Sequence, residues 1–116
     1  MKDAGVPSLD ILKKAGVRIG FGTDLLGESH RLQSDEFRIR NQVLTNQEVI
    51  ASATTTAADV LGMQGRLGRI QSGAIADLLV VDGNPMEDVA CLLGQGDDIP
   101  LVMKAGRVEF GSLDSL

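Results

Sequence analysis

The sequence VRIGFGTD at residues 17–24 is the starting point for predicting the fold. Apolar side chains alternate with polar residues and glycine along its first part, which predicts a buried β-strand over residues 17–21. Asp24 lies just beyond the carboxyl end of that strand. Because α/β proteins bind their ligands at this end of their strands, Asp24 is the first candidate for a functional side chain.

Short helices are expected on both sides of the strand. Residues 8–15 predict a helix that Ser8 caps and Gly16 ends. Residues 35–43 predict a second helix, in which apolar side chains lie among charged ones.

Two more helices are predicted after residue 44. Thr45 and Glu48 fit a capping box, in which each side chain accepts a hydrogen bond from the other residue's backbone N–H, at the start of a helix that runs to residue 53. Thr56 is expected to cap a last short helix over residues 57–61, which Gly62 closes. These helices are suited to cover one side of a sheet or barrel.

The second half of the sequence has a β-rich pattern. Residues 76–81 predict a buried strand, residues 99–104 and 107–110 predict two more, and Ala105-Gly106 between them predicts a two-residue hairpin turn. A turn and a short helical segment are expected between the first two strands, over residues 82–85 and 86–93. The change of pattern predicts two domains, residues 1–64 and 65–116.

Composition limits the size of the fold and the class of partner. A chain of 116 residues is too short for a complete eight-stranded α/β barrel, which needs about 250 residues. The net charge of −5 argues against nucleic acid or an anionic membrane as the main partner. Cys91 is the only cysteine, so no internal disulfide can form and a cytoplasmic protein is expected.

Asp24 allows two interpretations when it is taken alone. A carboxylate at the end of a buried strand can bind a metal ion and accept a proton from metal-bound water. An aspartate that only caps the following loop is the commoner case, and the short motif by itself favours that interpretation.

The loop after Asp24 contains the other polar candidates. His30 is the only histidine, and a lone histidine in a polar loop is more often a solvated surface residue than a ligand. Its closeness to Asp24, Glu28 and Arg31 favours a functional role, although Asp24, Glu28 and His30 could form at most part of a metal site. Arginines 31, 38 and 40 could each bind a substrate carboxylate in a bidentate contact, although ion pairs with Asp35 and Glu36 on a solvated helix face are the favoured alternative. Cys91 lies in an apolar stretch and is expected to be inert packing.

Several motifs together resemble the C-terminal part of the amidohydrolase superfamily. The resemblance is to the imidazolonepropionase-like and the Xaa-Pro or Xaa-Arg dipeptidase and carboxypeptidase members. The matching stretches cover nearly the whole chain: GFGTD at 20–24, ATTTAADVLG at 53–62, GRIQSGAIADLLVVD at 68–82 and VMKAGRV at 102–108.

The resemblance implies a mixed α/β fold that is a fragment of a larger enzyme. Residues 1–64 would form the last helix–strand–helix elements of a (β/α)₈ barrel, and residues 65–116 would form strands of a small β-sandwich domain. The parent would be a metal-dependent hydrolase of C–N bonds, with a dipeptidase-like or carboxypeptidase-like activity on a small, dipeptide-like substrate. Asp24 would bind one or two zinc ions and act as general base, and His30 and Arg31 would contact substrate.

The sequence departs from the family in what it lacks. The His-x-His pair, the bridging lysine or glutamate and two further histidines of the family do not occur in it. We therefore expect the chain alone to be inactive and to bind no zinc tightly. We also expect it to self-associate through the strand at residues 17–21, which would be an exposed barrel edge.

Two other functions explain the same sequence. A non-catalytic α+β module for binding or assembly would need no metal ligands. A subunit that completes the active site of another chain would contribute Asp24 and receive the remaining ligands from its partner.

Overall fold

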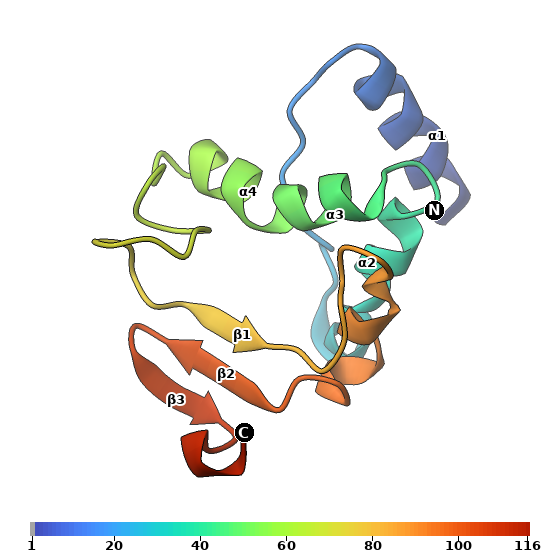
Figure 1. Cartoon of the computed structure of the whole chain (residues 1–116). Coiled ribbons are helices and arrows are strands. Elements are labelled where there is room, and N and C mark those ends of the chain that lie inside the picture. The colour runs from blue at the N-terminus through green and yellow to red at the C-terminus, as the bar shows by residue number, and fades with distance from the viewer. Residues whose placement is uncertain (1) are drawn as a thin grey trace.

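The structure is a computed structural model that describes residues 2–116, without the side chains of residues 2–4 and His30. Helices form one side of the molecule and a three-stranded sheet forms the other (Figure 1). The α-helices are α1 (Lys2–Lys14), α2 (Asp35–Arg40), α3 (Asn46–Ala53) and α4 (Thr55–Val60). The strands are β1 (Leu78–Val80), β2 (Leu101–Lys104) and β3 (Arg107–Phe110). Short 3₁₀ helices are η1 (Gly27–Leu32), η2 (Val89–Leu92), η3 (Gly94–Gly96) and η4 (Leu113–Ser115).

Helix α1 is longer than the sequence predicts. It begins at Lys2 and includes Pro7, so Ser8 lies inside it and the prediction that Ser8 caps it is wrong. The predicted stop is confirmed: the Gly16 N–H donates to the Lys13 carbonyl at 3.0 Å and the Val17 N–H donates to the Leu12 carbonyl at 3.1 Å. This pair of bonds is a Schellman motif, which satisfies the last carbonyls of the helix.

Helices α3 and α4 follow each other with one residue between them. The predicted capping box at α3 is confirmed, because the Glu48 N–H donates to Thr45 Oγ1 at 3.2 Å and the Thr45 N–H donates to Glu48 Oε1 at 3.1 Å. The predicted cap of α4 by Thr56 is wrong: Thr54 is the cap residue, and α4 begins at Thr55. The Thr54 hydroxyl instead donates to the Ile50 carbonyl at 2.8 Å.

Residues 17–26 form no strand, so the predicted strand over residues 17–21 is wrong. The segment has no partner strand, and among the described residues no backbone–backbone hydrogen bond reaches residues 18–24. A β-strand requires such a partner, and the alternation of side chains cannot provide one.

The sheet has the order β1-β2-β3 with both pairs antiparallel, and a bulge lies between Val102 and Met103. The predicted hairpin turn is confirmed, with φ of 50° at Ala105 and 80° at Gly106, as a type I′ turn requires. Asp77 ties this turn to the start of β1, since the Ala105 N–H donates to its Oδ1 at 2.8 Å.

One core connects the helices to the second half of the chain. It consists of Leu9, Leu44, Val49 and Val89, with partly buried side chains packed around it at Ile19, Phe37 and Val43. Helix η2 supplies Val89 and lies beside α2 (Figure 1). The division into domains at residues 64 and 65 stays a prediction.

The connection between α4 and β1 packs against the helices at Gly68. Its φ is +76°, and a Cβ there would lie 2.4 Å from the Thr54 carbonyl oxygen, so no larger residue fits without displacing backbone. In the described part of the chain, no helix is long and apolar enough to cross a membrane.

Candidate functional site

Asp24 lies at the end of the extended segment and is exposed to solvent. Its φ is 53°, a left-handed conformation that costs an ordinary L-residue roughly 1–2 kcal/mol and that aspartate tolerates better than most. The preceding Thr23 braces the turn, since the Leu25 N–H lies 3.5 Å from Thr23 Oγ1. Asp24 therefore has a left-handed backbone and an exposed carboxylate that a ligand can reach.

The other predicted site residues lie in η1, directly after this turn. Glu28 and Arg31 are exposed, and the side chain of His30 lies outside the described residues. Across residues 2–116, with the omissions given above, no three His, Cys, Asp or Glu side chains gather where they could hold a metal ion. A catalytic zinc site takes three protein ligands, so Asp24 fits one ligand position and these residues do not fit a complete site.

Two aromatic rings are in contact near the end of the segment that leads to Asp24. The centroids of Phe21 and Phe37 are 4.6 Å apart with the rings tilted by 34°. The guanidinium carbon of Arg40 lies 4.9 Å from the centroid of the Phe21 ring. This places a cation over an aromatic face three residues before Asp24.

Arg40 is buried, with 8% of its side chain exposed. Its Nε donates to Glu36 Oε1 at 2.9 Å, one helical turn earlier, and its buried Nη1 has no partner among the described residues. The predicted pairing of arginines with Asp35 and Glu36 is confirmed, because Arg38 Nη2 also lies 3.9 Å from Asp35 Oδ2. The prediction that these arginines lie on a solvated helix face is confirmed for Arg38. It is wrong for Arg40, whose buried guanidinium lies over the Phe21 ring.

A cavity of about 350 Å³ adjoins the segment before Asp24. Its wall combines residues of the segment and of α2 with apolar side chains from the second half of the chain. The lining residues are Phe21, Gly22, Thr23, Gln33, Ser34, Phe37, Leu79, Leu92 and Ile99. Its volume and its mainly apolar wall with a few polar groups are typical of small-molecule sites.

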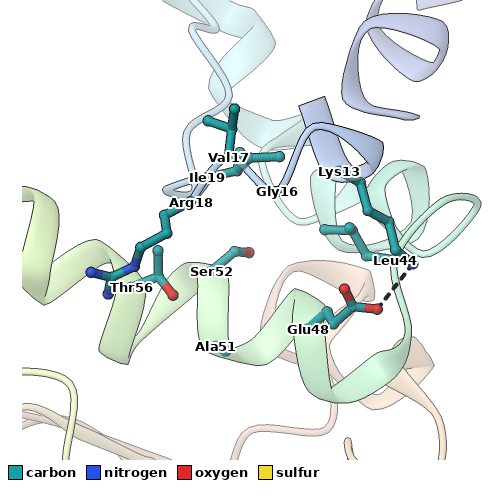
Figure 2. Close-up of a pocket in the computed structure, with 10 residues that line it drawn as sticks. All are labelled: Lys13, Gly16, Val17, Arg18, Ile19, Leu44, Glu48, Ala51, Ser52 and Thr56. Carbon is teal, nitrogen blue, oxygen red and sulfur yellow. Dashed lines mark hydrogen bonds and ion pairs between the residues drawn. The ribbon is translucent and has the colours of Figure 1, made fainter. Parts of the chain in front are cut away.

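A second cavity, of about 270 Å³, lies at the other end of the segment, between α1 and α3 (Figure 2). Figure 2 shows Lys13 with Glu48 at one end and Arg18 with Thr56 at the other. Both cations have acidic partners: Lys13 Nζ donates to Glu48 Oε1 at 3.1 Å, and Arg18 pairs with Asp59. The pKa of Glu48 is lowered by the Thr45 backbone N–H and next by Lys13. These pairs join α1 and the segment to α3 and α4 and leave little charge for a ligand.

Cys91 is partly buried and unpaired with any other cysteine. Its thiol donates to the Asp88 carbonyl at 3.3 Å, and burial raises its pKa. A raised pKa reduces the thiolate that would react, which agrees with the expected packing role.

The family model described as Amidohydrolase family matches residues 2–108. This chain belongs to the amidohydrolase family. Among curated relatives it is 30% identical over 119 residues to a 5-methylthioadenosine/S-adenosylhomocysteine deaminase of Symbiobacterium thermophilum, covering 85% of this chain and 27% of the deaminase. It is 40% identical over 63 residues to an imidazolonepropionase of Rubrobacter xylanophilus, covering 54% of this chain and 15% of that enzyme.

Solved amidohydrolase structures match almost the whole chain. One described as an amidohydrolase is 65% identical with a TM-score of 0.92, covering 96% of this chain and 27% of its own. A prolidase complexed with N-methylphosphonate-L-proline is 51% identical with a TM-score of 0.89, covering 93% of this chain and 26% of its own. A Xaa-Pro dipeptidase with bound methionine in its active site is 33% identical with a TM-score of 0.81, covering 91% of this chain and 25% of its own. The chain thus spans about a quarter of the length of these proteins.

These matches confirm the resemblance to imidazolonepropionases and Xaa-Pro dipeptidases. They also confirm a mixed helix–strand fold that corresponds to part of a larger amidohydrolase structure. The wider barrel and the β-sandwich domain stay predictions.

The cluster of Phe21, Phe37 and Arg40 is the part of the site that the sequence did not reveal. Glu36 and Arg40 are four residues apart, which predicts the ion pair, and Phe37 and Arg40 are three apart, on the same helix face. The missing information was that this face packs against Phe21, a contact across the fold that spacing does not encode.

Proposed function

We propose that this chain is the part of a metal-dependent amidohydrolase that contributes Asp24 to the metal site. The longer protein would hydrolyse the C–N bond of a dipeptide-like substrate. The observation that carries this proposal is the 51% identity, over 93% of the chain, to a prolidase whose structure was solved with N-methylphosphonate-L-proline. The 33% identity to a Xaa-Pro dipeptidase supports the same substrate class.

Asp24 would have two roles in that protein. One carboxylate oxygen would be a ligand to zinc, in a site of one or two ions, and the other would accept a proton from the attacking water. Zinc in such a site polarises the scissile carbonyl and lowers the pKa of water. The exposed position of Asp24 at the end of the extended segment suits this role.

His30 and Arg31 would contact the substrate from η1. An exposed guanidinium in this loop is suited to a bidentate contact with a substrate carboxylate. The same proposal includes a barrel formed in part by residues 1–64, a β-sandwich formed in part by residues 65–116, and a cytoplasmic location.

A chimaera tests the proposal. Residues 2–116 replace the corresponding segment of the amidohydrolase that is 65% identical, a graft that the TM-score of 0.92 favours. We expect the chimaera to hydrolyse Xaa-Pro dipeptides and Asp24→Asn to lower kcat by roughly 10²–10⁴-fold, the usual contribution of a general base. Asp114→Asn in η4 is the control and should keep full activity.

An active Asp24→Asn chimaera would contradict the role of Asp24. A folded chimaera without activity on Xaa-Pro dipeptides, but with activity on another amide, would contradict the substrate class alone.

A second candidate is a subunit that completes the site of another chain. It is favoured by the lack of a three-ligand group among the described residues. Affinity purification of the tagged chain from its native cells tests it: a stoichiometric, zinc-containing partner is the expected result. Recovery of the chain alone would count against this candidate and, in the absence of zinc, would favour a non-catalytic binding module.

A further inference from the structure

We propose that Arg40 is a positioning residue for Asp24, acting through the ring of Phe21. The guanidinium holds this ring against Phe37 and thereby fixes the place where the extended segment ends. The inference rests on the proposed function, because positioning Asp24 matters only if Asp24 is a metal ligand. The contacts of Arg40 with Phe21 and Glu36 do not depend on it.

Side chains alone hold the segment that leads to Asp24. No backbone–backbone hydrogen bond reaches residues 18–24 among the described residues. Arg18 pairs with Asp59 at the start of the segment, Ile19 packs against the core, and Phe21 contacts both Phe37 and Arg40.

Phe21 is the last of these anchors before Asp24. An extended chain spans at most about 3.3–3.6 Å per residue, so an anchor three residues away confines Asp24 to within about 10 Å. Without Phe21 the next packed anchor on the N-terminal side is Ile19, five residues away, which allows a reach of about 17 Å from that side. A metal ligand must be held within a fraction of an ångström, and η1 holds the chain only from the other side of Asp24, so the contacts at Phe21 are needed to fix its position.

Arg40 is an unusual choice for packing alone. A buried ion pair is weak evidence for stability, since apolar residues of similar volume often stabilise a protein as well or better. Arg40 also has a buried Nη1 without a partner in the described structure, which is unfavourable. Its ion pair with Glu36 instead fixes the guanidinium over the Phe21 ring, where burial strengthens a cation–π contact.

Fluorine NMR of the intact chain tests the inference, because the chain has three phenylalanines. With fluorophenylalanine incorporated, Phe21 and Phe37 report on the cluster, and Phe110 on β3, 60% exposed, is an internal control. We expect Arg40→Met to shift the Phe21 signal towards its position in the unfolded chain and to leave Phe110 unchanged. Arg40→Lys, which keeps the charge, should restore part of the shift. Arg38→Met, on the exposed face of the same helix, should move none of the three signals.

The ¹³C chemical shifts of Asp24 provide the link to the site, since they report its left-handed backbone. In Arg40→Met they should move most of the way to their unfolded values. Unchanged Phe21 and Asp24 signals in Arg40→Met would overturn the inference. An equal shift of Phe110 would also overturn it, because Arg40 would then support the whole fold. Where Arg40→Met does not fold, Glu36→Gln combined with Arg40→Met removes the unpaired carboxylate and serves instead.

The inference and the proposed function fail separately. Zinc binding or activity that survives Asp24→Asn would contradict the role of Asp24, while the NMR result for Arg40 would stand. Unchanged NMR signals would remove Arg40 as a positioning residue and leave Asp24 as a proposed ligand.

Discussion

The hairpin of β2 and β3 and the segment at residues 17–24 are both extended chain, but they are held in different ways. The hairpin is held by backbone hydrogen bonds across its ladder and by a type I′ turn. Residues 18–24 of the segment have no backbone–backbone hydrogen bonds among the described residues and depend on side chains, from Arg18 at one end to Phe21 near the other. The conformation of the hairpin is therefore determined by its own turn residues, whereas that of the segment is determined by side-chain contacts with the helices.

The largest expected effect comes from breaking the sheet at Gly111. Its φ is +86°, and a Cβ there would lie 2.0 Å from the carbonyl oxygen of Pro100, the residue directly before β2. Gly111→Ala should lower the free energy of unfolding by about 4 kcal/mol, from the strained backbone together with the clash. Urea unfolding measures the change.

Gly73→Ala is the matched control for this prediction. Gly73 has the same φ of +86°, and a Cβ at this position would have no atom within 4 Å, so the variant should lose only about 1 kcal/mol. Equal losses in the two variants would show that the close approach to Pro100 is unimportant.

The segment should respond to Phe21→Ala, which removes its last anchor. We expect a loss of about 2 kcal/mol in the free energy of unfolding, below the usual range for a fully buried phenylalanine because Phe21 is half-buried. The loss should be local: limited proteolysis should cut within residues 17–26 before the sheet is cleaved. Phe110→Ala, on the exposed hairpin, should cost about 0.5 kcal/mol and open no new site.

The contrast between local and long-range contacts also explains how much of the fold could be predicted from the sequence. The capping box of Thr45 and Glu48 and the turn at Ala105 and Gly106 involve neighbours in the chain, and both predictions are confirmed. The strand at residues 17–21 is predicted from its alternation alone, and the prediction is wrong because a strand also needs a partner.

The candidate site likewise has one residue that the sequence identifies and one that it does not. Asp24 is identified from its place after a run of alternating residues, and its metal-binding role stays a prediction. The contact of Arg40 with Phe21 joins residues 19 positions apart through tertiary packing. Neither charge nor spacing distinguishes Arg40 from the exposed Arg38, so the sequence alone could not single it out.

Substitutions at helix caps test, with a smaller expected effect, how much interactions between neighbouring residues stabilise the fold. Thr45→Ala should lower the free energy of unfolding by about 1 kcal/mol, since it removes a hydroxyl that caps α3. Thr56→Ala should change it by less than about 0.5 kcal/mol, because Thr56 is not the cap of α4. Urea unfolding of both variants compares them, and a larger loss at Thr56 would contradict the assignment of Thr54 as the cap.

The smallest expected effect is the pH dependence that Glu48 contributes. Its pKa is lowered in the folded chain from an ordinary value of 4.5, by the Thr45 backbone N–H first and then by Lys13. Its contribution to stability is therefore complete above pH 4.5 and is lost as the pH falls through the lowered pKa. The carboxylate is 42% exposed, so this contribution should stay below about 0.5 kcal/mol.

Unfolding in urea at neutral pH and at about pH 3 measures this contribution, with Glu48→Gln for comparison. The glutamine keeps an oxygen that accepts from Thr45, so its stability should depend less on pH in this range. Identical pH dependence of the two proteins would contradict the assignment.

The central claim is that Asp24 is a metal ligand, and the zinc content of the purified chimaera tests it most directly. Elemental analysis should find one or two zinc ions per chain in the chimaera, as the proposal states, and clearly less in Asp24→Asn. Asp114→Asn should retain all of the zinc. Equal zinc content in the chimaera and in Asp24→Asn would contradict the account.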